Sequence, residues 1–184
     1  MDPQTLIGNK FYTADVVSLY TNIKVDKAIQ NVIDMFVEHR DEINMYGLNP
    51  TQLHEMLETV FHHSYFSYNK HVYLQILGLF MGCIPSPILA VCRVHMFECA
   101  SIYTDINFIT NYFYKIYIDD AGSTAHLMEE AQLRMDKIAE QDEDKLLKWE
   151  LDFPSSPDKK YTAFLRSEVR IAEDGTVQSR LYQK

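Results

Sequence analysis

The amino-acid sequence predicts an α+β fold in which a mainly antiparallel sheet is backed by helices. Short runs rich in aromatic and β-branched residues, which favour strands, alternate with stretches whose apolar residues recur at helical spacing. Several of the short runs follow one another across a tight turn, and strands joined in this way pair antiparallel. The length of 184 residues and the hydrophobic share of 47% are those of one globular domain over residues 1–184.

The first half of the chain is predicted to contain a strand, two helices and a hairpin. Apolar runs mark the strands, and residues that favour N-caps mark the helix starts. In chain order we expect a strand over 11–19, a helix over 26–40 capped by Asp26, a helix opened by Asn49-Pro50-Thr51, and strands over 64–68 and 71–75 joined by an Asn69-Lys70 turn.

The second half is predicted to contain a helix, a hairpin, a second helix and a final hairpin. An acidic run at 140–144 is expected to form a solvated face of that second helix. In chain order we expect a helix from Ser86 to about residue 102, a strand over 113–118, a turn at 119–122 with a short return strand, a helix over 128–149, a strand over 161–172, and a turn at 173–175 into a strand over 176–182.

Acidic residues accompany two of the apolar strands. Asp119 and Asp120 follow the aromatic strand over 113–118, and Asp15 lies inside the apolar run 11–19. For the first pair taken alone, a solvated turn is the favoured interpretation, because Asp is common in turns. A carboxylate in a buried strand, however, is costly without a cation or hydrogen-bond donors. If the two strands are neighbours, the three carboxylates converge, and such oxygen ligands suit Mg²⁺.

A loop rich in glycine and proline over 78–87 leads into the helix that begins at Ser86. Glycine lets a backbone approach a ligand closely, and the N-terminus of a helix favours an anion. The alternative is a loop whose path glycine and proline merely shape.

In order and spacing, these stretches resemble the palm of a reverse transcriptase. Asp15 matches the metal-binding aspartate of that family's first motif, residues 78–87 resemble the second motif, and Tyr117-Ile118-Asp119-Asp120 resembles the third, the F/Y-x-D-D box. Three segments are similar to Penelope-like retroelements in particular: residues 15–23, Met81-Gly82 and residues 86–90. The resemblance spans nearly the whole chain.

The resemblance implies an RNA-directed DNA polymerase that transfers nucleotides with two Mg²⁺ or Mn²⁺ ions. Asp15 and Asp119 would hold the ions, with weaker help from Asp120 and with the backbone carbonyl of Val16 as a further ligand. The implied partners are an RNA or DNA template-primer and a deoxynucleoside triphosphate.

The same resemblance implies substrate contacts for residues outside the metal site. Tyr20 matches the aromatic residue that excludes a 2′-hydroxyl on the incoming nucleotide. The loop at Gly82 and Ser86 would let the nucleotide and the template lie against backbone. No lysine is clearly marked to protonate the pyrophosphate; Lys148 is one candidate, and a role on a helix surface is its alternative.

The chain also departs from the family's pattern. Cys83, Ile84 and Pro85 replace the usual central residues of the second motif. Only about 14 residues precede Asp15, so most of the fingers are expected to be missing, as is the thumb. A domesticated palm-like module that no longer polymerises, and that binds a protein partner or a second copy, is therefore the alternative function. The retained carboxylates argue against long decay, because an inert scaffold has no need of them.

Charge and cysteine content limit which partners and which cellular compartment we expect for this chain. There are 26 acidic residues against 17 basic ones, a net charge of -9, so we expect the chain alone to bind nucleic acid weakly. The three cysteines form no Cys-x-x-Cys pair, which is typical of free thiols in a reducing compartment, nuclear or cytoplasmic. We also see no signal peptide and no apolar run that would span a membrane.

Histidines and aromatic residues gather between residues 54 and 73. The histidines match no closed zinc site in their spacing, so surface or structural roles are favoured. For the aromatic residues, packing within the predicted hairpin is the favoured interpretation, and stacking on nucleic-acid bases is the alternative. The two groups are His54, His62, His63 and His71, and Tyr65, Phe66, Tyr68 and Tyr73.

Overall fold

The computed structural model describes residues 3–105, 112–154 and 161–182. The chain divides into two compact units, of which one combines Met1–Val17 with Phe97–Lys184 and the other is Ser18–Met96. Helix α4 (Ser86–Ser101) contributes residues to both units. None of the helices in the described ranges has both the length and the apolar character that a membrane crossing requires.

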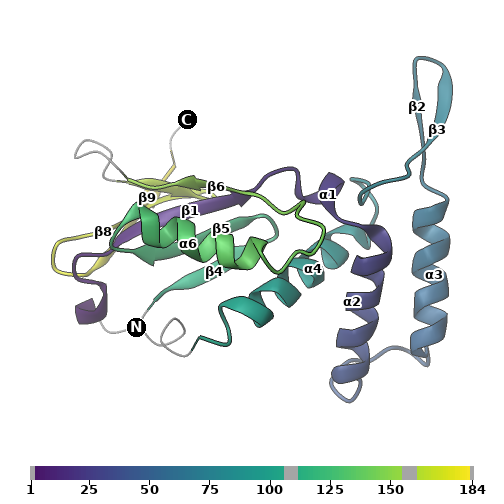
Figure 1. Cartoon of the computed structure of the whole chain (residues 1–184), viewed down its shortest axis with the longest axis horizontal. Helices are drawn as coiled ribbons and strands as arrows, with labels where there is room; N and C mark the ends of the chain where they lie inside the picture. Colours follow the sequence, from purple (N-terminus) through teal and green to yellow (C-terminus); the bar gives the residue numbers. More distant parts are fainter. Residues whose placement is uncertain (1–2, 106–111, 155–160, 183–184) are drawn as a thin grey trace. The chain divides into compact units, whose positions relative to one another are not determined.

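The first unit is organised around a four-stranded antiparallel sheet with strand order β4-β5-β1-β6 (Figure 1). Of these strands, β1 and β4 are rich in aromatic and β-branched residues, as the sequence predicted. A 3-10 helix, η1 (Pro3–Leu6), precedes the first strand. The strands are β1 (Lys10–Val16), β4 (Tyr114–Tyr117), β5 (Asp120–Ala125) and β6 (Trp149–Asp152). The predicted α+β class with an antiparallel sheet is confirmed.

One face of this sheet is covered by helix α6 (Met128–Ala139), which lies across it in Figure 1. The helix buries Ala131, Met135 and Ile138, which share one side of it at the spacing of helical turns. The sheet presents Tyr12 on this face, where burial raises the pKa of its hydroxyl and the nearby charge of Arg134 opposes the rise. Because side chains alternate along a strand, Phe11, the neighbour of Tyr12, points to the other face.

The predicted helix over 128–149 is wrong in its second half, because α6 ends at Ala139. Asp142 is the physical reason. Its buried carboxylate accepts hydrogen bonds from the backbone N–H groups of Leu146 at 2.8 Å and Leu147 at 3.0 Å, and these bonds hold a loop in place of a helix. The acidic run is therefore not a solvated helix face, and it leads into strand β6, which was not predicted.

A second sheet covers part of the other face of the central sheet. Its strands are β7 (Thr162–Phe164), β8 (Ser167–Ile171) and β9 (Val177–Leu181), in that order. The ring of Phe164 meets the ring of Phe11 edge-on, with 5.8 Å between centroids. A Cβ atom at Gly122 would lie 2.8 Å from Phe11 Cζ and 3.1 Å from Phe164 Cε2, so only glycine fits beneath the two rings.

The predicted strand over 161–172 is wrong as a single element. A turn at Leu165, which has φ 55°, divides it into β7 and β8. The predicted turn at 173–175 is confirmed, since β8 and β9 pair across it. The final hairpin is therefore part of a three-stranded meander.

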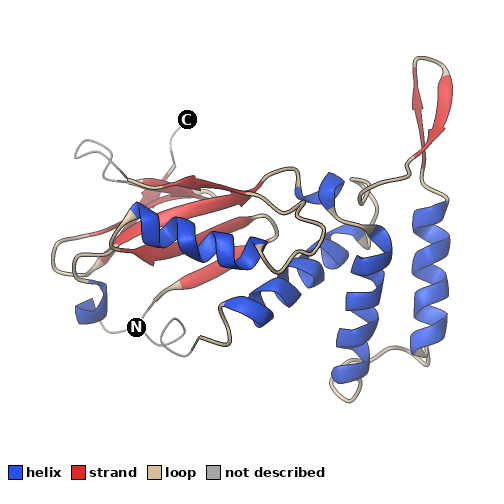
Figure 2. Ribbon diagram, viewed as in Figure 1, coloured by secondary structure: helices blue, strands red, loops and turns tan. Residues whose placement is uncertain are grey.

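The second unit consists mainly of helices (Figure 2). Helices α2 and α3 pack together and bury an apolar stripe that includes Ile29, Ile33, Phe36, Leu57 and Phe61. The bounds are α1 (Leu19–Asn22), α2 (Val25–Glu38), α3 (Pro50–His62), β2 (Tyr65–Tyr68) and β3 (His71–Leu74), followed by the first part of α4.

Local signals in this unit predicted the element boundaries with mixed success. Asn49 caps α3 as expected and forms a capping box with Gln52. Asn69 and Lys70 have φ 48° and 65°, which is the turn that joins two strands tightly. Asp26 is not a cap, because α2 begins one residue earlier, after Lys24, which makes no side-chain cap bond. In the first turn, the carboxylate of Asp26 still faces the favourable end of the helix dipole.

Candidate active site

The turn between β4 and β5 brings two carboxylates to the end of β1. The aromatic strand β4 does not pair with β1, because β5 lies between them. The return strand, predicted to be short, has six residues and pairs in a register that places Asp120 opposite Asp15. The backbone N–H of Val16 also donates to the carbonyl of Asp119 at 3.0 Å. The predicted convergence of Asp15, Asp119 and Asp120 therefore occurs, through β5.

Four residues form one row across the sheet. Tyr117 pairs with Asp120, Asp120 with Asp15, and Asp15 with Glu150 of β6. Directly paired residues of neighbouring strands project to the same face, so these four side chains share the face that also carries Phe11. We call Asp120, Asp15 and Glu150, together with the turn residue Asp119, the carboxylate row.

Glu150 was missed because the sequence analysis continued a helix to residue 149. The available signal was the alternation Trp149-Glu150-Leu151-Asp152, which is typical of a strand with one polar face. Placed opposite Asp15, Glu150 adds a fourth negative charge to the neighbourhood.

The electrostatics of the row oppose its ionisation. Neighbouring protein removes part of the hydration of Asp15 although the side chain stays accessible, and this loss raises its pKa; the charges of Asp119, Asp120 and Glu150 raise it further. Partial burial and the charge of Asp119 likewise raise the pKa of Asp120, which is half-buried. Like charges that raise one another's pKa are typical of a functional site, and a bound cation would compensate them.

The turn that carries Asp119 is strained. Ile118 has φ 60°, a left-handed conformation that a β-branched residue adopts only when its surroundings impose it. Such backbone strain costs about 1–3 kcal/mol and is found most often at functional sites. The strain lies directly beside the first carboxylate of the pair, so it supports a functional role for this turn.

The donor set of the row suits a hard divalent cation, because carboxylate and carbonyl oxygens are the ligands that Mg²⁺ prefers. Within the described residues, no group of three His, Cys, Asp or Glu side chains is already arranged to hold a metal ion. The carboxylates are close enough to raise one another's pKa. To bind one ion together, their side chains would have to turn toward one another. The buried residue Val16 follows Asp15 at the end of β1, and its backbone carbonyl is the further ligand that the sequence analysis named.

Lys148 lies at the same end of the sheet, directly before β6. It is not on a helix, so the predicted helix-surface alternative is wrong. The carbonyl of Lys148 accepts a hydrogen bond from the N–H of Val17 at 2.9 Å, and its side chain is exposed.

Tyr20 and the start of the glycine-rich loop lie together in the second unit. Tyr20 is in the short helix α1, and its carbonyl accepts from the N–H of Leu79 at 2.7 Å. A Cβ atom at Gly78 would lie 2.7 Å from Thr21 Cα and 2.8 Å from the Tyr20 carbonyl oxygen. Glycine is therefore required there, since it lets the loop pass against the backbone of α1.

Gly82 and Ser86 have different surroundings. Gly82 is exposed, has φ 91° and has open space where a Cβ would be, so its backbone is accessible to a ligand. Ser86 is 1% exposed, and its hydroxyl donates to the carbonyl of Phe80 at 2.8 Å. Ser86 therefore fixes the shape of the loop from inside.

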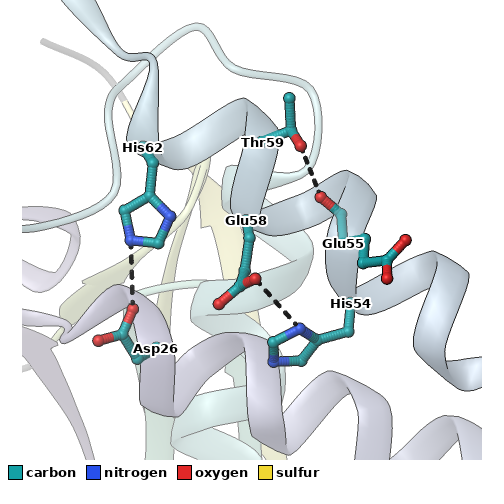
Figure 3. A network of polar contacts seen from close by, with 6 residues as sticks. All are labelled: Asp26, His54, Glu55, Glu58, Thr59 and His62. Atoms are coloured by element: carbon teal, nitrogen blue, oxygen red, sulfur yellow. Dashed lines mark hydrogen bonds and ion pairs between the residues drawn. The ribbon is translucent and has the colours of Figure 1, made fainter.

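The histidines of α3 make surface contacts with carboxylates (Figure 3). His54 Nδ1 lies 3.5 Å from Glu58 Oε2, and His62 Nε2 lies 3.7 Å from Asp26 Oδ1 on α2. Surface pairs of this kind stabilise a fold only slightly.

Comparisons with known proteins identify similarities in structure alone. No protein-family model matches the chain, and no curated protein sequence matches it either. A telomerase from Candida tropicalis is similar with a TM-score of 0.66 and 10% identity, over 97% of this chain. The same telomerase truncated from its C-terminal domain gives a TM-score of 0.64 and 10% identity over 94% of this chain.

A telomerase from Candida albicans, solved in complex with a fragment of telomeric RNA, is similar with a TM-score of 0.66 and 12% identity over 92% of this chain. The chain covers 31 to 35% of these telomerases, about a third of their length. At such low identity, the similarity establishes the fold and leaves the chemistry to be argued from the residues.

Proposed function

We propose that this chain, whose fold is reverse-transcriptase-like, is the palm core of an RNA-directed DNA polymerase that works by two-metal nucleotidyl transfer. The carboxylate row carries the proposal: Asp15, Asp119 and Asp120 meet on one end of an antiparallel sheet, next to a strained turn. A cluster of like charges destabilises a fold unless a ligand compensates it, and phosphoryl transfer uses paired cations at such a site.

Asp15, Asp119 and Asp120 would hold two Mg²⁺ or Mn²⁺ ions, with the carbonyl of Val16 as a further ligand. Bound there, the ions would supply positive charge to a primer 3′-hydroxyl and to the leaving pyrophosphate. The sheet fixes the positions of two of these residues, because Asp15 on β1 and Asp120 on β5 each have a paired strand on both sides. Lys148, at the same sheet end, remains the candidate that would donate a proton to the pyrophosphate.

Substrate contacts are proposed for Tyr20, Gly82 and Ser86. Tyr20 would exclude a 2′-hydroxyl by steric conflict, supported by the hydrogen bond between its carbonyl and the loop at Leu79. Gly82 would let the nucleotide and the template approach the exposed backbone. Ser86 would act through the loop that its hydroxyl shapes.

The proposed partners are an RNA or DNA template-primer and a deoxynucleoside triphosphate. The Candida albicans telomerase was solved in complex with RNA, and we extend nucleic-acid binding to this chain. The finer assignment to Penelope-like elements is supported by the sequence segments 15–23 and 86–90.

Primer extension on an RNA template tests the proposal directly. With Mg²⁺ or Mn²⁺ we expect extension by the parent chain and a loss of at least about 100-fold in Asp119→Asn, because one charge-stabilising group is removed. Asp136→Asn is the matched control, since Asp136 is exposed on α6 and is bound by the amide of Gln132. Melting temperature is the second readout: ions should raise it in the parent and in the control, but not in Asp119→Asn.

A non-polymerising palm-like module that binds a protein partner is the second candidate. The net charge of -9 favours it, because nucleic acid is repelled by an acidic surface. No extension by the parent, together with no ion-dependent shift in melting temperature, would support this candidate and refute the polymerase.

A further inference from the structure

The hairpin β2–β3 leaves large apolar and aromatic side chains in water. It extends beyond the end of α3 as an isolated two-stranded ribbon (Figure 1), and all eight of its strand residues are exposed. Among its large apolar and aromatic residues, Tyr68 and Val72 are the most exposed, and each keeps 72% of its surface accessible. The hairpin is held at its base, where the N–H of Gln75 donates to the carbonyl of the buried Ser64 at 2.8 Å.

Strand register divides the hairpin into two different faces. Phe66 pairs with Tyr73 and Tyr68 pairs with His71, so four ring side chains share one face. The opposite face carries a mixed set, Tyr65, Ser67, Val72 and Leu74. We call Phe66, Tyr68, His71 and Tyr73 the aromatic platform.

Three rings of the platform, those of Phe66, His71 and Tyr73, contact one another. Phe66 and Tyr73 are stacked, with 5.5 Å between centroids and 23° between planes. His71 meets Tyr73 edge-on at 6.5 Å. Rings fixed by their neighbours lose little conformational freedom when a flat ligand stacks on them, so the platform is prepared for binding.

Charge around the platform differs from that of the chain as a whole. The chain has 26 acidic residues, yet none lies between Thr59 and Phe97, where Lys70 and Arg93 are the basic ones. Lys70 lies at the tip of the hairpin beside His71, and among the described residues no ion pair involves it. The hairpin is therefore free of the charges that repel phosphate in the rest of the chain.

We propose that the aromatic platform binds the bases of single-stranded nucleic acid by stacking, with Lys70 meeting a phosphate of the same strand. Every base has a flat π-face, so exposed rings with a nearby cation suit single strands without regard to sequence. The inference extends the proposed function by naming where a single strand is held, and its test requires no polymerisation. A protein partner would favour the mixed face equally, and it offers no reason for four of the hairpin's five rings to gather on one side.

Fluorescence anisotropy with a labelled, unstructured single-stranded 12-mer tests the proposal on the full chain. Phe66→Ala/Tyr73→Ala is expected to weaken binding at least about 10-fold, since stacked bases are lost. Tyr68→Ala should weaken binding less, and Tyr65→Ala on the opposite face is its matched control, with no change expected. RNA and DNA arms distinguish the two kinds of strand, and a duplex of the same sequence should bind more weakly because its bases are already stacked.

Each other outcome overturns the proposal. Failure of the parent to bind at concentrations up to hundreds of micromolar, or equal affinities of the parent and Phe66→Ala/Tyr73→Ala, would refute it. Loss of self-association in that variant, measured by light scattering at unchanged affinity for the oligonucleotide, would show a contact between copies instead. Asp15→Asn separates the two functions, because it should abolish extension and leave oligonucleotide binding intact.

Discussion

The carboxylate row and the aromatic platform place residues in surroundings that raise their free energy, but the two sites are supported in different ways. The row sits on a four-stranded sheet, where Asp15 has a partner strand on each side. The platform sits on a ribbon of two strands, which is marginally stable by itself. One site is costly because like charges repel, and the other because rings stay in water.

This difference indicates what each site needs from its surroundings. The proposed two-metal chemistry would need ligands fixed to within a fraction of an ångström, which a sheet paired on both sides of Asp15 can provide. The proposed stacking on bases would tolerate small displacements, for which a two-stranded ribbon is sufficient. We therefore expect substitutions near the row to change stability strongly and comparable substitutions on the hairpin to change it little.

The largest difference in stability between the two regions is expected when a side chain is added beneath the central four-stranded sheet. Gly122→Leu would place atoms against Phe11 and Phe164, where even a Cβ is 2.8 Å from the nearest ring atom, and should lower the free energy of unfolding by about 1–3 kcal/mol or more. Ser67→Leu makes a similar addition on the exposed hairpin and should cost less than about 0.5 kcal/mol. Urea denaturation of both variants measures the contrast, and equal losses would break it.

Removing one tyrosine hydroxyl from each region tests the same difference in stability with a smaller chemical change. The Tyr114 hydroxyl on β4 donates to Oε1 of Glu98 at 2.5 Å, and Glu98 is only 1% exposed. Burial, and then the charge of Glu98, raises the pKa of Tyr114, so this tyrosine stays a donor. Tyr114→Phe should cost about 1–3 kcal/mol and Tyr68→Phe less than about 0.5 kcal/mol in thermal unfolding. A small loss in Tyr114→Phe would mean that Glu98 is satisfied without it.

A smaller change in stability, in this case a gain, is expected from a substitution in the carboxylate row. Because the pKa values of Asp15 and Asp120 are raised from 3.8, the folded state binds protons more tightly than the unfolded state. That stabilisation is complete below pH 3.8 and is lost as the pH rises through the folded-state pKa values. In metal-free buffer at pH 7, Asp120→Asn should therefore raise the melting temperature by about 1–2 °C.

Melting curves at several pH values check this sign. The gain from Asp120→Asn should shrink as the pH approaches 4, whereas Asp136→Asn on α6 should show no gain at any pH. A lower melting temperature for Asp120→Asn at pH 7 would mean that the row stabilises the fold, against the argument made for a cation site.

The smallest effect is expected at the histidine contacts of the second unit. Asp26→Asn removes the charge 3.7 Å from His62, on a surface where both groups are exposed (Figure 3). We expect a change below about 0.5 kcal/mol, measured by denaturation at pH 6 and at pH 8. A larger loss at pH 6 would place this pair among the contacts that hold α2 against α3.

Features fixed by neighbouring residues could be predicted from the sequence. The Asn49 cap and the Asn69-Lys70 turn depend on local backbone chemistry, and the structure has both. The convergence of Asp15 with Asp119 and Asp120 could be predicted conditionally, because carboxylates beside apolar strands are unusual wherever the strands lie.

Features that depend on distant contacts could not be predicted in the same way. The helical pattern over 128–149 gave no sign that Asp142 would bind backbone N–H groups and begin a loop. Because strand β6 was not predicted, the pairing of Glu150 with Asp15 could not be predicted either. The position of β5 between β4 and β1 is likewise a property of sheet order, which composition and spacing do not determine.

The two-residue turn between β4 and β5 has a consequence for how this chain can vary. Direct pairing with Tyr117 and with Asp15 sets the face on which Asp120 lies. Asp119 belongs to the turn itself, where its carbonyl accepts a hydrogen bond from the N–H of Val16. A residue added to the turn would therefore displace Asp119 and leave Asp120 in place. Natural length variation at this turn should alter one carboxylate of the pair and spare the other.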